Sequence, residues 1–426
     1  MTYMSTTGRW FAVALLAVGT GCDLEVSNPG PVQDDFLNDS GAHAALVAGI
    51  EMSVARGFSM VGFFGADAAK EYTQGGRIHP IKLTPNPGQL DLDEQLPDNA
   101  WNDAHEARWV AEDGVRRLME NVSSFDSSPL AARALLYSGY TNRLLGENMC
   151  DAVIDGDEMQ DRTVHLERAE SWFTDAIAVA EAAGEADLVT AAYAGRASVR
   201  LWLAKNDEAV ADAMQVPVDF EYRLEFGLAD DQHYNWIQYV SSNTPYRLHS
   251  VWNTYYEDYY LSTGDPRVAW GTDPDVPTAE FAYVPWYFQL KYPELDSPMN
   301  LSSGREMVLI RAEAALRSGD RDGAMDLINS LRTGIADDTG TPIPLWTASN
   351  ATEAWTALKR ERGIELWLET RRLGDLWRWV ENDVPGEMED VSDRIRLCFP
   401  VGRIELETNP NIPLDYRGPV NPLFTG

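Results

Sequence analysis

The stretch that decides the fold is ERGIELWLETRRLGDLWRW, residues Glu361–Trp379. Its residues are mostly good helix formers and its two glycines lie near the ends, so the pattern predicts one helix. Its charges are unusual. Glu361, Glu365 and Glu369 recur every four residues on one face, and exposed like charges at this spacing repel by about 0.2–0.5 kcal/mol per pair. This row of carboxylates therefore requires cations, supplied by Arg362, Arg371 and Arg372 or by another segment.

The bulk composition indicates a folded, strongly acidic protein. The chain has 426 residues and is 44% hydrophobic, which is ample for a large core. Lys and Arg number 34 against 67 Asp and Glu, so the formal net charge is −33. This balance argues against nucleic acid as a partner, because binding phosphates requires clustered Lys and Arg. We interpret the excess as a solvated acidic coat.

The N-terminus has the pattern of a targeting segment. Arg9 precedes the nine-residue apolar run Trp10–Val18, which is too short to span a bilayer, and three small residues then precede Cys22. The arrangement resembles a bacterial lipobox, although Gly19 stands where Leu is usual. We predict a lipoprotein signal peptide over residues 1–21, lipidation of Cys22, and a polar tether over residues 22–32. The alternative is an ordinary secretory signal with an incidental cysteine.

Helical periodicity covers most of the remaining chain. Two stretches, AYAGRASVRLWLAKNDEAVADA and EMVLIRAEAALRSGDRDGAMDLINSLR, resemble the tetratricopeptide plan of helix, short polar turn and helix. We therefore predict a mainly α fold in which tetratricopeptide-like helix pairs form a scaffold. The predicted helices are Ala42–Ala55, Trp101–Val122, Leu130–Leu145, Leu166–Ala183, Leu188–Lys205, Asp207–Met214, Arg305–Leu316 and Asp322–Leu331.

Ten residues of the opening stretch resemble the C-terminal signature of the SusD/RagB family, surface lipoproteins of bacterial outer-membrane nutrient uptake. They are Glu361, Arg362, Glu365, Leu366, Glu369, Arg372, Asp375, Leu376, Arg378 and Trp379. The turn Asp265-Pro266-Arg267 and the segment Asn409-Pro410-Asn411 resemble the family as well. We interpret the signature as structural, a buried charge network that fixes helix packing. In the turn, Asp265 is expected to cap its own backbone and Arg267 to hold the loop.

The resemblance implies a single SusD-like domain over residues 33–426. It also implies lipid anchoring at the extracellular face of the outer membrane and a SusC-like TonB-dependent transporter as partner. The expected ligand is an oligosaccharide, with peptide or another polymer left open, and the expected mechanism is binding rather than catalysis. The alternative from another class is a secreted helical-repeat scaffold that binds a protein.

The expected ligand site lies in an irregular lobe at about residues 215–300, with few short strands. Residues 233–292 contain 16 of the chain's 44 aromatic residues and several prolines. Aromatic faces stack on sugar rings beside polar partners, although most of these rings are expected to be core. The candidates in the lobe are Trp236, Trp252, Tyr256, Trp270 and Trp286. The resemblance adds Asp67, Tyr72 and Gln74, where the family's N-terminal loops approach ligand.

The sequence contains no recognisable catalytic or metal-binding motif. The sequence HEARW from His105 lacks the second His of a zinc-protease helix, and we expect no enzyme activity, no cofactor and no metal. An unusual calcium site in the acidic stretch Asp151–Asp161 is the weaker alternative. With Cys22 lipidated, Cys150 and Cys398 remain as a pair in an exported protein, which favours a disulfide over two separate buried thiols.

Overall fold

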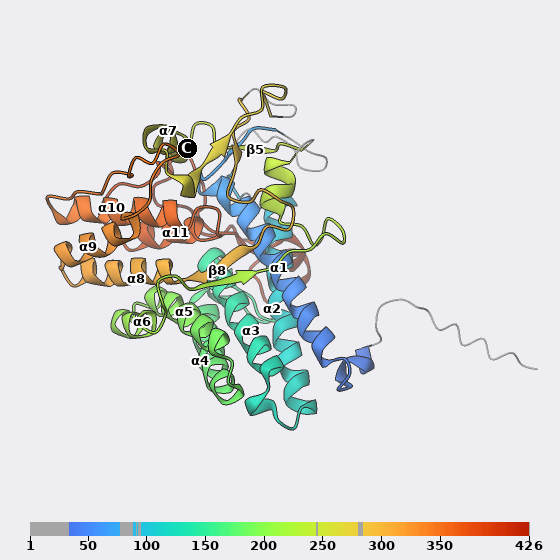
Figure 1. The fold of residues 1–426 in the computed structure, drawn as a ribbon. Helices are drawn as coiled ribbons and strands as arrows, with labels where there is room; N and C mark the ends of the chain where they lie inside the picture. Colours follow the sequence, from blue (N-terminus) through green and yellow to red (C-terminus); the bar gives the residue numbers. More distant parts are fainter. Residues whose placement is uncertain are drawn as a thin grey trace, which may run out of the picture.

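The computed structural model describes residues 34–76, 88–90, 92, 95–243, 246–279 and 284–425. Within these ranges the chain is mainly helical (Figure 1). The α-helices are α1 (His43–Ala68), α2 (Gln95–Asn121), α3 (Pro129–Asn148), α4 (Thr163–Ala183), α5 (Ala186–Trp202), α6 (Asn206–Ala213), α7 (Tyr255–Thr263), α8 (Gly304–Arg317), α9 (Arg321–Arg332), α10 (Ala351–Glu365), α11 (Arg372–Glu381) and α12 (Arg403–Thr408). Four shorter helical turns are η1 (Asp34–Asn38), η2 (Phe125–Ser127), the π-helical η3 (Ile237–Ser242) and η4 (Pro266–Val268).

Helix α1 lies at the core. It packs against α2, α3 and α11, and its apolar face continues thirteen residues beyond the Ala55 end predicted from the sequence. By length and composition α1 is the one described helix that could cross a membrane. Most of its C-terminal half is buried in this fold, so it serves here as a core helix.

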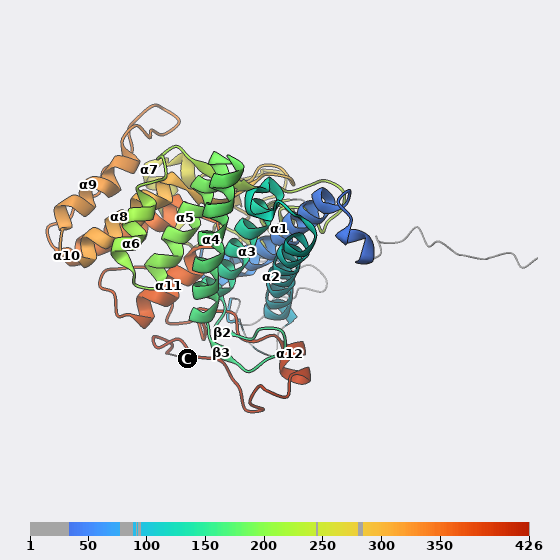
Figure 2. The ribbon, with the colours of Figure 1, turned by 90° about the horizontal axis from the view of Figure 1, so that it is seen from below.

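The helix pairs form a continuous scaffold, which confirms the tetratricopeptide-like prediction. Helices α3 to α6 pack side by side in chain order, and α6 contacts α8 of a second block built from α8, α9 and α10 (Figures 1 and 2). Phe173 of α4 lies where α3 and α5 approach. A Cβ added at Gly139 or Gly195 would lie 2.6 or 2.3 Å from this ring. Two glycines therefore allow the close packing of three helices.

The strands are short and join distant segments in antiparallel pairs. The four pairs are β1 (Thr73–Gln74) with β5 (His249–Ser250), β2 (Asp151–Ala152) with β3 (Gln160–Asp161), β4 (Glu221–Leu224) with β8 (Met299–Ser303), and β6 (Trp270–Gly271) with β7 (Phe288–Gln289). Strands β4 to β8, together with α7 and η3, lie between α6 and α8 in the chain and make up the lobe, and β1 joins it by pairing with β5. This agrees with the predicted irregular lobe with few strands.

One prediction about the opening stretch is wrong: Glu361–Trp379 is not one helix. Helix α10 ends at Glu365 and α11 begins at Arg372. Leu368 and Thr370 between them adopt left-handed backbone conformations, with φ of 61° and 63°. The turn is held from outside, because the buried Glu71 carboxylate accepts from Leu368 N at 2.8 Å. Tertiary contacts therefore override helix propensity at this point.

The C-terminal segment is tied back to the scaffold. A disulfide joins Cys150 to Cys398, across 248 residues of sequence, and Cys150 N donates to Phe399 O at 2.9 Å. Asn409 Nδ2 and Asn411 Nδ2 donate to backbone carbonyls of the acidic loop, at Asp157 and Gly156. The predicted signal peptide, the tether and Cys22 lie outside the described residues.

Candidate ligand-binding site

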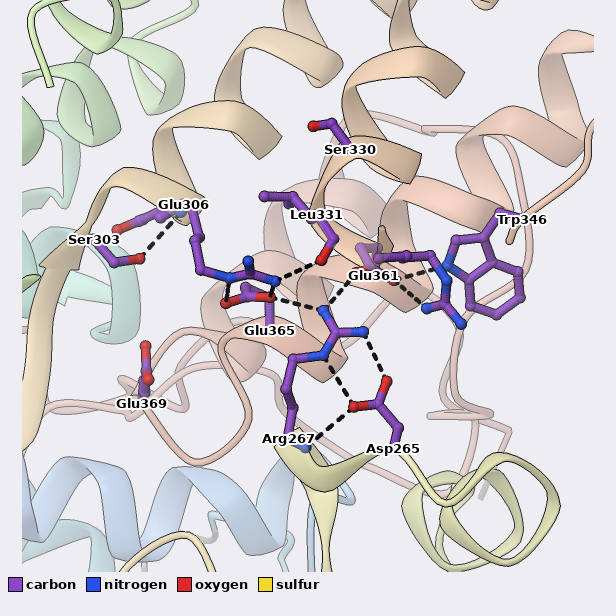
Figure 3. A network of polar contacts seen from close by, with 12 residues as sticks. Asp265, Arg267, Ser303, Glu306, Ser330, Leu331, Trp346, Glu361, Glu365 and Glu369 are labelled. Atoms are coloured by element: carbon purple, nitrogen blue, oxygen red, sulfur yellow. Dashed lines mark hydrogen bonds and ion pairs between the residues drawn. The ribbon is translucent and has the colours of Figure 1, made fainter. Parts of the chain in front are cut away.

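The cations that the row of carboxylates requires come from other segments. Glu361, fully buried, accepts from Arg267 and Arg332 at 2.6 Å each. Glu365 accepts from Arg305 at 2.5 Å and Arg267 at 2.8 Å (Figure 3). Glu369 is paired separately, with Lys291 at 2.6 Å. The network therefore links α10 to α8, α9 and the lobe.

Arg267 is the hub on the lobe side. Asp265 caps its own turn by accepting from Arg267 N at 3.1 Å, and it also accepts from the Arg267 side chain (Figure 3). Burial opposes the charge on Arg267, but its bond to Asp265 and the nearby Glu361 and Glu365 raise its pKa above the ordinary value. The structure shows both roles that were expected of this turn: Asp265 caps its own backbone, and Arg267 holds the loop.

The arginines of the same stretch form ion pairs with other acidic residues, and not with Glu361, Glu365 or Glu369. Arg362 binds Asp375 at 2.9 Å, Arg371 binds Glu147 and Glu306, Arg372 binds Glu389, and Arg378 binds Glu313 and Asp375. All of these side chains are buried. Burial opposes ionisation of Glu313, yet Arg378 and Arg317 lower its pKa to about 2. Such a buried network of ion pairs fixes the relative positions of helices.

An aromatic pocket lies directly beside this network. Its volume is about 380 Å³, and its rings come from Tyr255 and Tyr259 on α7 and from Trp346. Tyr259 is nearly parallel to both neighbours, with ring centres 5.6 Å from Tyr255 and 6.3 Å from Trp346. The remaining lining residues are Asp258, Ser262, Thr263, Arg332, Pro344 and Leu345. The size and mixed lining fit a small polar ligand with an apolar face.

Local sequence explains how α7 presents this wall. Thr254 caps the helix by accepting from Glu257 N, and Gly264 ends it in the left-handed conformation with φ of 65°. Between these ends, Tyr255, Asp258, Tyr259 and Ser262 have the spacing that places residues on one helical face. The opposite wall, Pro344–Trp346, comes from the loop between α9 and α10.

The charge network positions two of the three rings. Trp346 Nε1 donates to Glu361 Oε2 at 2.8 Å (Figure 3). Arg332 donates to the same carboxylate and, at 2.9 Å, to the hydroxyl of Tyr259. That hydroxyl donates to Asp265 at 2.9 Å. Glu361 therefore orients the walls of the pocket without lining it.

Five of the eight sequence candidates are buried, so the structure gives them packing roles. Tyr72 stacks on His249, Tyr256 stacks on Trp367, and the indole N–H of Trp286 donates to Ser241 O. Asp67 and Gln74 are each only 8% exposed. Burial raises the pKa of Asp67 to about 6. Aromatic density alone did not distinguish these core positions from exposed ones, because large rings are buried by default.

Three candidates are half-buried, and none of them lines the pocket. Trp236 is covered on one face by the Arg56 guanidinium, 4.5 Å from the ring centre. Trp270 stacks on Tyr287 at 4.3 Å. Trp252 follows β5, and its carbonyl accepts from Thr73. These side chains lie in the same lobe as α7, outside the lining of the aromatic pocket.

The pocket residues were not selected from the sequence. Tyr255 and Tyr259 gave a usable signal, because their four-residue spacing sits between a capping Thr and a terminal Gly. Trp346 gave none, since it lies in a loop far along the chain. Among the described residues, no three His, Cys, Asp or Glu side chains form a group that could hold a metal ion.

Comparisons with known proteins agree on one family. Residues 305–411 match the sequence model of the SusD family. A SusD superfamily protein from Bacteroides thetaiotaomicron superposes with a TM-score of 0.65 at 13% identity, covering 91% of this chain and 99% of its own. The fold of the chain is SusD-like.

Two further structures extend the SusD-like match. A SusD/RagB family protein from Bacteroides thetaiotaomicron has a TM-score of 0.63 at 14% identity, with 86% of this chain and 94% of that one covered. A SusD-like carbohydrate binding protein from Bacteroides vulgatus has a TM-score of 0.57 at 13% identity, with coverage of 80% and 83%. Among curated proteins, no sequence matches the chain. The low identities mean that the superpositions establish the fold alone.

Proposed function

We propose that the protein is a carbohydrate-binding lipoprotein of the outer membrane, exposed on the cell surface, and that it binds ligand without chemical conversion. The observation that carries the proposal is the aromatic pocket of Tyr255, Tyr259 and Trp346, whose rings flank hydroxyl and carboxylate side chains. Sugar rings combine C–H faces that stack on aromatics with hydroxyls that need polar partners. The description of one structural relative as carbohydrate binding supports the same class of ligand.

In this proposal residues 33–426 act as one SusD-like unit that is lipidated at Cys22 and delivers oligosaccharide to a SusC-like TonB-dependent transporter. The half-buried Trp236, Trp252 and Trp270 remain proposed as additional contacts for a longer chain. A gene for such a transporter beside the gene for this protein would support the partnership.

The test is a glycan and peptide binding screen on the purified protein, followed by calorimetry with Tyr255→Ala. Losing one stacking ring should cost about 1–1.5 kcal/mol, which is roughly a five- to tenfold loss of affinity. Tyr193→Ala on α5 is the matched control, because Tyr193 is half-buried and lies outside the pocket. Peptide binding with no glycan binding would contradict the ligand class, and equal effects of the two variants would contradict the site.

A further inference from the structure

In the aromatic pocket, more hydrogen-bond acceptors than donors are available to a ligand. Apart from the Tyr255 hydroxyl, the donors of the pocket are already engaged: Trp346 Nε1 donates to Glu361, and the Tyr259 hydroxyl donates its single proton to Asp265. Arg332 is 2% exposed, and its three nitrogens donate to Pro344 O, Glu361 and the Tyr259 hydroxyl at 2.8, 2.6 and 2.9 Å. The guanidinium of Arg332 therefore holds the fold together, and it does not serve as a binding group for an anion.

The groups still available in the pocket are mainly acceptors. Ser262 Oγ and Thr263 Oγ1 both donate to the Tyr259 carbonyl, at 3.0 and 2.7 Å, so each hydroxyl keeps its lone pairs for another donor. Asp258 is exposed and has no hydrogen bond or ion pair with any residue that the structure describes. A ligand that supplies donors matches this lining, whereas a ligand rich in anionic acceptors does not.

The charges around the pocket also favour a ligand that supplies donors over an anionic ligand. Asp265, Glu361 and Glu365 carry three negative charges that balance Arg267, Arg305 and Arg332 in the buried network. The carboxylate of Asp258 is then the unbalanced charge in the pocket lining. The chain as a whole carries −33, which adds a long-range field that repels anions.

We propose that the aromatic pocket selects glycans rich in hydrogen-bond donors, prefers sugars with a free amine, and rejects uronic-acid and sulfated glycans. This deepens the proposed carbohydrate function and rests on it. An ammonium group offers three donors to Asp258 and the two hydroxyl oxygens. A carboxylate or sulfate group meets the Asp258 charge and finds no free cation in the lining, which is an effective way to reject a competitor.

The test compares matched hexasaccharides of glucose, glucosamine and uronic acid, each in α-1,4 and β-1,4 linkage. Titration calorimetry at mildly acidic pH and low salt keeps the amine protonated and the surface charges unscreened. We expect the glucosamine chains to bind about threefold more tightly than glucose chains of the same linkage, and the uronic acid chains at least tenfold more weakly. The amine preference should fall as salt is added.

Asp258→Asn should remove the amine preference, so that glucosamine and glucose chains of the same linkage then bind with equal affinity. Asp326→Asn is the matched control, since Asp326 is exposed on α9 and outside the pocket lining. Uronic acid chains that bind as tightly as glucose chains, or an amine preference that survives Asp258→Asn, would overturn the inference. So would a failure of all six chains to bind. The proposed function itself fails only if the wider glycan screen also finds no ligand.

Discussion

At Glu361 a single carboxylate meets two arginines and an indole N–H in the interior of the protein. The structural interpretation of the signature, a buried charge network that fixes helix packing, accounts for every one of these contacts. The same contacts also fix Trp346 and, through Arg332, Tyr259. A residue with no access to ligand thus determines the geometry of the surface proposed to bind it.

Glu361→Gln tests this role. Removing one charge from a fully buried pair leaves Arg332 and Arg267 undercompensated, which should cost about 3–5 kcal/mol of stability. Urea unfolding followed by tryptophan fluorescence gives the change. Glu208→Gln on the exposed face of α6 should stay within about 0.5 kcal/mol of the parent, and an equally small change for Glu361→Gln would mean that the network is not stabilising.

Glu71 gives a pH-dependent prediction. Burial raises its pKa from 4.5 to about 8, so the folded protein binds a proton that the unfolded chain releases. The contribution of this group to stability is therefore greatest below pH 4.5 and declines as pH rises to about 8. Glu71→Gln keeps an oxygen for Leu368 N and removes the titration.

We expect Glu71→Gln to gain stability relative to the parent as pH rises through this range, measured as melting temperature. Glu106→Gln, exposed on α2, should follow the parent at every pH. A constant difference between parent and Glu71→Gln across the range would show that Glu71 does not titrate there.

At the scale of elements, the helix pairs were predictable because their apolar periodicity and polar turns are local properties. The break between α10 and α11 was not. Nothing in Glu361–Trp379 itself marks Leu368 and Thr370 as left-handed. The conformation of Leu368 is stabilised by Glu71, almost 300 positions earlier in the chain. Propensity and spacing describe a helix in isolation, whereas this turn depends on a partner that the local sequence does not contain.

The crossing of α11 over α3 can be tested through Gly374. A Cβ at this position would lie 2.5 Å from the Glu147 carbonyl oxygen and 2.9 Å from Trp202. Gly374→Ala should therefore destabilise the protein by about 1–3 kcal/mol. Gly49→Ala on α1, where a Cβ meets nothing within 4 Å, should instead be neutral or gain up to about 1 kcal/mol. Equal effects in denaturant unfolding would contradict the close packing.

For the whole molecule, the sequence predicted an aromatic-rich lobe better than it predicted which aromatic residues of that lobe are exposed. The lobe is where the aromatic residues concentrate, but Tyr72, Tyr256 and Trp286 are core and the pocket wall includes a tryptophan from outside that stretch. Exposure is decided by how α7, the 344–346 loop and α10 meet. That arrangement follows from ion pairs between segments far apart in the chain, which composition cannot reveal.

Membrane attachment is the last prediction and depends on one atom, the sulfur of Cys22. Two or three acyl chains hold a protein firmly to a bilayer, whereas a single chain binds only marginally. Cys22→Ala should therefore shift the protein from the membrane fraction to the soluble fraction. The unfolding free energy of the released variant is the control for folding, and we expect it to equal that of the parent. The measurement should be made with and without the proposed SusC-like transporter, because binding to such a transporter would also retain the protein. Persistence in the membrane fraction without that partner would show that the anchor is not the lipid on Cys22.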